Sequence, residues 1–144
     1  MYRHIGIIIA VLMMSAGTAY HISYDNHGEA VWTEHNINIP EGISREDSAR
    51  LTIEASFGKH SPNFAPPGTH VTTLIIQDEH IVINLSKNAL SFGRDYYENT
   101  IRKQIIKTAL EIEGIRSITT LVDKGDYYRY EKYTPRGSNP GPAD

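Results

Sequence analysis

ALEIEGIRSITTLVDKG, residues 109–125, is the stretch that decides the fold. Its first apolar residues recur at helical spacing, Gly114 interrupts them, and Ile118, Thr120 and Val122 then alternate with their neighbours. Recurrence every three or four residues is typical of a helix with one buried face, whereas alternation is typical of a strand. A glycine supplies the left-handed backbone that often ends a helix. The stretch therefore predicts a helix that ends at Gly114 and a strand that returns the chain into a sheet.

The predicted helix extends upstream to Asp95, a residue type that caps helix N-termini well. Its buried face is formed by residues spaced four, four, three and four apart: Tyr97, Ile101, Ile105, Thr108 and Ile112. The other side carries charges of both signs: Glu98, Arg102, Lys103, Lys107 and Glu111. Because these charges are mixed, we interpret this side as a solvated face and not as a nucleic-acid surface.

A shorter helix is predicted after Ser44, whose hydroxyl can accept a hydrogen bond from an early backbone N–H. Ala49, Ile53 and Phe57 follow at i, i+4 and i+8, so they share one face. Gly58 provides the exit from this helix.

A hairpin lies between the two helices. Residues 69–76 and 81–85 are rich in β-branched and aliphatic side chains, and a short polar turn separates them. Residues 60–68 hold three prolines and therefore form a loop. Together these elements predict an α+β fold in which two helices pack on one face of a small antiparallel or mixed sheet.

Residues 1–19 have the composition of an export signal. The apolar stretch from Ile5 to Met14 has the length of a signal-peptide core, and small residues precede a cleavage position after Ala19. An uncleaved membrane anchor is the alternative, because no formally charged residue lies between Ile5 and Tyr24 and about 20 helical residues cross a bilayer. In either case we expect an exported chain that meets the membrane only through this segment.

The remaining boundaries follow from composition. Residues 20–29 are polar and are predicted to be a linker. Residues 30–133 form the predicted domain, which opens with a strand that holds Trp32, the single tryptophan. Residues 134–144 are rich in proline and glycine and are predicted to be a disordered tail.

The bulk composition excludes several classes of function. Lys and Arg total 14 against 17 Asp and Glu, a formal net charge of −3, which gives no basic stripe for a nucleic acid. The chain has no cysteine, so disulfides, thiolate chemistry, thiolate zinc sites and lipid attachment to cysteine are excluded.

The order of elements and motifs resembles the spore-germination GerMN domain family over roughly residues 30–130. The family's Pro-x-Gly-Thr-like loop is matched by Pro66-Pro67-Gly68-Thr69, and its Val-Asp-Leu-Ser-like strand by Ile83-Asn84-Leu85-Ser86. The last helix and strand match through Thr108-Ala109-Leu110, Glu113-Gly114-Ile115 and Leu121-Val122-Asp123-Lys124-Gly125. Three departures are Asn84 for aspartate, Asp78-Glu79 for an Asp-Gly turn, and one residue inserted before Gly125.

The resemblance implies a fold similar to the ring-building domains of secretion systems. It also implies an exported, non-enzymatic module that binds proteins of the bacterial cell envelope or of a sporulation complex. A second copy of the chain is a further partner that this resemblance suggests.

No residue pattern predicts a catalytic, cofactor or metal site. His60, His70 and His80 are ten residues apart, without the close spacing of a helical metal site. The carboxylates of Asp78-Glu79 are adjacent in a turn, and those of Glu111 and Glu113 are expected to point different ways. No Gly-x-Ser-x-Gly elbow is present. We therefore expect no enzyme activity, no cofactor and no metal ion.

The tyrosine-rich stretch from residue 126 to 133 is the one candidate interface. Tyr127, Tyr128, Tyr130 and Tyr133 would place amphipathic rings on both faces of an edge strand, and aromatic residues are enriched where proteins bind one another. The simpler interpretation is that one face packs on the core and the other is solvated. Two other functions stay open: a module that binds peptidoglycan or polysaccharide through these tyrosines, and a small exported enzyme or inhibitor whose loop 60–68 forms a cleft with the hairpin.

Overall fold

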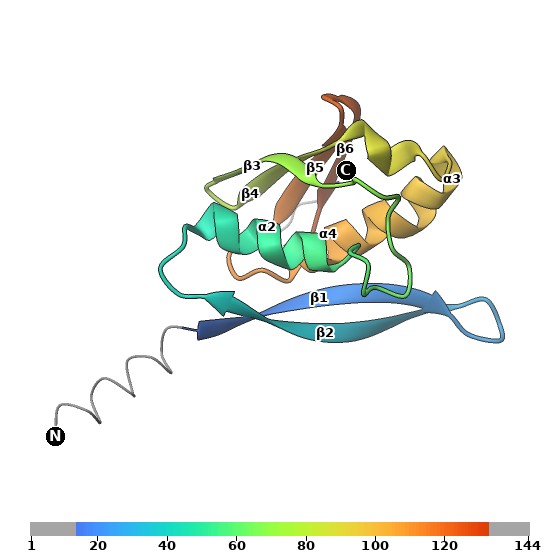
Figure 1. Ribbon diagram of the computed structural model, residues 1–144, viewed down its shortest axis with the longest axis horizontal. Coiled ribbons are helices and arrows are strands. Elements are labelled where there is room, and N and C mark those ends of the chain that lie inside the picture. The colour runs from blue at the N-terminus through green and yellow to red at the C-terminus, as the bar shows by residue number, and fades with distance from the viewer. Residues whose placement is uncertain (1–13, 133–144) are drawn as a thin grey trace, which may run out of the picture.

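A computed structural model describes residues 14–132 (Figure 1). The apolar part of the export segment, the tail 134–144 and Tyr133 lie outside the described residues, so these predictions stay predictions. The strands are β1 (Met14–Tyr24), β2 (Ala30–Pro40), β3 (Val71–Gln77), β4 (His80–Leu85), β5 (Ser117–Val122) and β6 (Gly125–Glu131). The helices are α2 (Arg45–Ala55), α3 (Arg94–Tyr96) and α4 (Arg102–Leu110), with a 3-10 turn η1 (Lys87–Leu90) and a π-helical turn η2 (Tyr97–Ile101).

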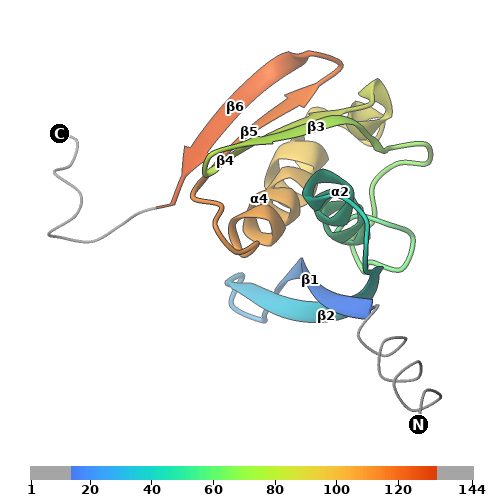
Figure 2. The same cartoon turned by 90° about the vertical axis from the view of Figure 1, so that its left-hand side faces the viewer.

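The elements form three layers (Figure 2). A four-stranded sheet of order β3-β4-β5-β6 is one outer layer, α2 and α4 are the middle layer, and the β1–β2 hairpin is the other outer layer. β4 and β5 are parallel, and the other neighbouring strands are antiparallel. The predicted α+β fold, with two helices on one face of a mixed sheet, is therefore confirmed.

The main core lies between the larger sheet and the helices. Ile81, Ile83 and Leu85 of β4 are fully buried, as are Ile53 of α2 and Ile105 of α4. Each such side chain contributes about 1.5 to 3 kcal/mol when it leaves water. The alternating and helical spacings of the sequence thus correspond to this core.

The second helix differs from the prediction at both ends. Gly93, with φ 104°, occupies the N-cap, and Asp95 lies inside the first turn, where its charge suits the positive end of the helix dipole. A π-helical turn then joins α3 to α4, and α4 ends at Leu110. After Leu110 the backbone continues in tighter turns up to Gly114. Gly114 has a φ of 88°, the left-handed conformation that is predicted for the residue that ends the helix.

The N-terminal hairpin is the main correction to the predicted domain boundaries. Residues 20–29 are not all linker, because Tyr20–Tyr24 continue β1, which pairs with β2 from Met14 opposite Pro40 to Tyr24 opposite Ala30. The folded domain therefore begins before residue 30. Ala19, the residue before the predicted cleavage position, has an exposed fraction of 0%.

Polar groups hold this hairpin on the helices. The backbone N–H of Tyr20 donates to Thr108 Oγ1 and that of Ile22 donates to Gln104 Oε1, each at 3.0 Å. Gln104 is fully buried and also donates to the backbone oxygen of Ser56 at 2.8 Å. Thr108 thus lies on the buried face of the helix, as its spacing predicts, whereas the sequence pattern does not indicate that Gln104 is buried.

Two departures from the family pattern contact each other. The side-chain oxygen of Asn84 accepts the backbone N–H of Lys124, in the turn with the extra residue, at 2.7 Å. The Asn84 amide also donates to Thr72 Oγ1, which a carboxylate could not do. The asparagine of β4 therefore connects β3, through Thr72, to the turn between β5 and β6.

Candidate interaction surface

The tyrosine-rich strand β6 lies at the edge of the larger sheet, as predicted. Tyr128 and Tyr130 share the face that lies toward α4, because side chains alternate along a strand. Tyr127 lies on the opposite face and is 66% exposed, against 36% for Tyr128 and 41% for Tyr130. The rings of Tyr128 and Tyr130 are thus only partly covered by α4, and neither face of β6 is fully buried in the core.

These two tyrosines line a groove that continues across α4 to β2, and we call it the aromatic groove. It has a volume of about 280 Å³. Its lining consists of Trp32, Lys103, Ile106, Lys107, Leu110, Tyr128 and Tyr130. The sequence prediction found the tyrosines but not Trp32 or Ile106, since only the docking of the hairpin on α4 brings β2 to this place.

A cation holds one wall of the aromatic groove in position. The guanidinium carbon of Arg102 lies 4.0 Å from the ring centre of Tyr128 and 5.7 Å from that of Tyr97. Contacts of this kind are worth about 0.5 to 1 kcal/mol at exposed sites. Tyr97 is itself buried, and burial raises its pKa to about 12. Arg102 therefore connects the exposed ring of Tyr128 to the core.

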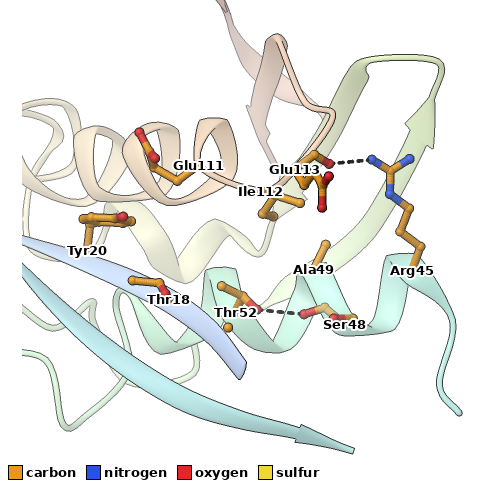
Figure 3. A pocket seen from close by; sticks show the side chains of 10 residues that line it. Thr18, Tyr20, Arg45, Ser48, Ala49, Thr52, Glu111, Ile112 and Glu113 are labelled. Atoms are coloured by element: carbon orange, nitrogen blue, oxygen red, sulfur yellow. Dashed lines mark hydrogen bonds between the residues drawn. The ribbon is translucent and has the colours of Figure 1, made fainter. Parts of the chain in front are cut away.

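A second hollow, of about 240 Å³, lies where β1 and α2 meet the end of α4 (Figure 3). Arg45 Nη2 donates to the backbone oxygen of Glu113 at 3.0 Å, and Thr52 Oγ1 donates to that of Ser48 at 3.0 Å. Glu111 and Glu113 both line the hollow, but their carboxylates point apart (Figure 3). Its lining holds neither histidine nor cysteine, so no hydroxyl there has a neighbouring base of the usual kind.

The proline loop 60–68 borders a third hollow, of about 510 Å³. Glu54 and His70 both line it, yet each is engaged with the backbone. Glu54 Oε2 accepts the N–H of Val71 at 2.8 Å, and His70 Nδ1 lies 2.8 Å from the oxygen of Gly68. These contacts hold the loop against α2 and β3, and they do not form the acid–base pair that a cleft enzyme would need.

The three regularly spaced histidines do not come together as a metal site. Within residues 14–132, no group of three or more His, Asp or Glu side chains could hold a metal ion. His80 lies on the outer face of the larger sheet, where Nδ1 is 2.6 Å from Ser117 Oγ and Nε2 is 2.9 Å from Thr119 Oγ1. Burial lowers the pKa of His80, the cation of Arg129 lowers it further, and Glu131 opposes them.

His21 is a buried histidine of the hairpin, with an exposed fraction of 6%. Its Nδ1 lies 2.9 Å from the hydroxyl of Ser61. Burial lowers the pKa of His21, a backbone contact with Ser56 opposes this, and the neighbouring His35 lowers it further. Ser61 is only 3% exposed, so this pair holds β1 against the proline loop and does not meet a substrate.

The helices within residues 14–132 do not combine the length and the apolar composition that a membrane-spanning helix requires.

Comparisons with known proteins support the fold and the family. The tandem GerMN domains of the sporulation protein GerM from Bacillus subtilis are similar in structure, with a TM-score of 0.62 and 10% identity over 81% of this chain and 41% of that chain. The first GerMN domain of the same protein gives a TM-score of 0.52 and 14% identity over 77% of this chain and 84% of that one. At these identities the likeness shows the fold alone.

The search of curated protein sequences finds no match. The Germane family, described as "Sporulation and spore germination", matches residues 18–125, which run from β1 to the end of β5 and include both main helices, whereas all of β6 after Gly125 lies beyond the match. This match begins inside β1, in agreement with the position of that strand in the folded domain. The chain therefore belongs to the Germane family of sporulation and spore germination domains.

Proposed function

We propose that the chain is an exported, non-enzymatic module that binds a protein of the bacterial cell envelope during sporulation or spore germination. The observation that carries this proposal is the aromatic groove, in which Trp32, Tyr128 and Tyr130 meet at a partly exposed surface. Clustered aromatic side chains are typical of protein-binding surfaces. The family match supports the biological setting.

The position of β1 supports a membrane-anchored form of this module over a cleaved one. Cleavage after Ala19 would remove Met14–Ala19, which pair with residues 35–40 of β2. It would also expose a new chain end beside Tyr20, whose N–H is bonded to Thr108. We infer that the N-terminal segment is retained, so that the domain faces the outside of the cytoplasmic membrane.

Membrane fractionation and mass spectrometry of the purified chain test this retention. We expect the intact N-terminus in the membrane fraction. A soluble extracellular chain that begins at Tyr20 would contradict the inference.

Genetic replacement tests the function itself. In a spore-forming host that carries this gene, deletion should reduce spore formation or germination, and the wild-type gene should restore it. A Tyr128→Ala/Tyr130→Ala variant should fail to restore it at equal protein level. Tyr127→Ala, on the opposite face of the same strand, is the matched control and should restore it. Normal sporulation and germination after deletion would contradict the proposal.

A cell-wall polysaccharide is the second candidate ligand, because exposed aromatic rings can also stack on sugars. Purified peptidoglycan would then retain the wild-type chain and release the variant in which Tyr127, Tyr128, Tyr130 and Tyr133 are alanine. Equal retention of the two chains would exclude this function.

A further inference from the structure

We infer that the aromatic groove binds an acidic polypeptide segment that inserts one large apolar side chain between Trp32 and the tyrosines of β6. This inference rests on the proposed binding function and names the chemistry of the partner.

The size and lining of the groove indicate the anchor. Ile106 and Leu110 of α4 form its apolar floor, and Trp32, Tyr128 and Tyr130 form its walls. The volume of about 280 Å³ suits one large aliphatic or aromatic side chain and not a whole helix face. A single anchor residue that fills a pocket lined by aromatic rings is a common source of binding energy between proteins.

The charges around the groove indicate an acidic partner. Lys103 and Lys107 line it, its lining includes no carboxylate, and Arg102 lies beside it on the ring of Tyr128. Lys103 and Arg102 form no ion pair with any residue between 14 and 132, whereas Lys107 Nζ lies 3.5 Å from Glu111. This local excess of positive charge contrasts with the formal net charge of −3 for the chain. Complementary charge guides association and selects the partner.

The edge of the larger sheet favours a polypeptide over a polysaccharide or a lipid surface. β6 pairs with β5 on one side, and no described strand pairs with its other side. The free edge offers backbone N–H and C=O groups beside Tyr128 and Tyr130. An extended peptide can pair with such an edge while its alternate side chains enter a neighbouring pocket.

A phage-displayed library of random short peptides tests the inference on the folded domain. The library is selected on the wild-type chain after depletion on a Trp32→Ala/Tyr128→Ala variant. We expect the enriched peptides to hold one Leu, Ile, Phe or Trp flanked by Asp and Glu. Enrichment of basic or uncharged peptides would overturn the inference. So would peptides that bind the wild-type chain and the Trp32→Ala/Tyr128→Ala variant equally well.

The enriched peptide is then synthesised and titrated into the protein. Trp32, the only tryptophan of the chain, reports binding through its own fluorescence. Lys103→Glu should weaken binding about fivefold or more at low salt, because it replaces attraction by repulsion. Lys87→Glu, an exposed cation of η1 that does not line the groove, should bind as the wild type does. Equal affinity of the Lys103 and Lys87 variants would contradict an acidic partner.

The two proposals can fail separately. A chain that binds no acidic peptide but whose deletion impairs sporulation would refute this inference and leave the proposed function in place. Peptide binding with normal sporulation after deletion would refute the proposed function alone.

Discussion

The two sheets of this domain are held on the same helices by different forces. The larger sheet buries complete aliphatic side chains, such as Ile81, Ile83 and Leu85, against them. The β1–β2 hairpin buries fewer, and nearly all of β2 is at least partly exposed. Its position depends on backbone bonds to Gln104 and Thr108. Because a two-stranded hairpin is marginal alone, we expect the larger sheet to set the global stability and the hairpin to be released first.

The largest effect should come from the core of the larger sheet. Ile83→Ala should lower the free energy of unfolding by about 2 to 5 kcal/mol, because it removes a fully buried side chain and leaves a cavity. Val31→Ala, at a position of β2 that is 42% exposed, is the matched control from the other sheet and should have a small effect. Urea denaturation followed by circular dichroism measures both. Similar losses for the two variants would contradict the comparison.

A smaller and more local effect should follow the loss of the polar contact. Gln104→Leu leaves the N–H of Ile22 and the oxygen of Ser56 without their partner, at a cost of about 1 to 3 kcal/mol for each buried group. The hairpin should therefore separate before the core unfolds. Trp32 fluorescence should change at a lower urea concentration than the helix signal does. One shared transition, at the wild-type midpoint, would show that Gln104 does not hold the hairpin.

Steric fit gives a further test of the hairpin. A Cβ atom at Gly17 would lie 2.5 Å from Thr52 Oγ1 and 2.9 Å from Ile39 Cδ1. Gly17→Ala should therefore push β1 away from α2 and cost about 1 to 3 kcal/mol. Ser23→Ala, at an exposed position of the same strand, should cost little. Differential scanning calorimetry compares the two, and a Gly17→Ala chain as stable as Ser23→Ala would argue against the described packing of β1.

The smallest effect should be a dependence on pH. Because the pKa of His21 is lowered in the folded chain, the unfolded chain binds more protons just below the ordinary value of about 6.5. His21 thus contributes stability that is present above that pH and is lost as the pH falls toward the folded pKa. Urea denaturation at several pH values, followed by Trp32 fluorescence, measures how the stability of the hairpin depends on pH. His21→Gln should make the loss of this stability at low pH smaller. His80→Gln, on the larger sheet, should change only the pH dependence of global unfolding. No change with His21→Gln would contradict this assignment.

The sequence predicts the larger sheet well because its contacts are apolar and periodic. The spacings of Ile53, Ile83, Ile105 and Ile118 each indicate the element and its buried face. Of the β1–β2 hairpin, the sequence predicts only the strand that holds Trp32. The small residues around Ala19 are typical of a signal-peptide cleavage site, and they therefore do not indicate the strand β1. Polar side chains such as Gln104 give no periodic sign that they will be buried. Tertiary contact alone brings them together.

The same difference explains how much of the candidate site could be predicted. Tyr128 and Tyr130 were identified from composition, and their place on an edge strand is confirmed. Trp32 was noted as the single tryptophan, but its contact with that surface depends on the docked hairpin. Tyr133 lies outside the described residues, and the binding role of all four tyrosines stays a prediction.

Hydrogen exchange at two backbone amides tests the central claim most directly, namely that the hairpin is docked on the helices and completes the groove. In the full chain, NMR should show slow exchange for the N–H groups of Tyr20 and Ile22, which are bonded to Thr108 and Gln104. Gln104→Leu should remove this protection and leave the amides of β4 slow. Exchange of Tyr20 and Ile22 at the rate of an unstructured chain in the wild type would contradict the account.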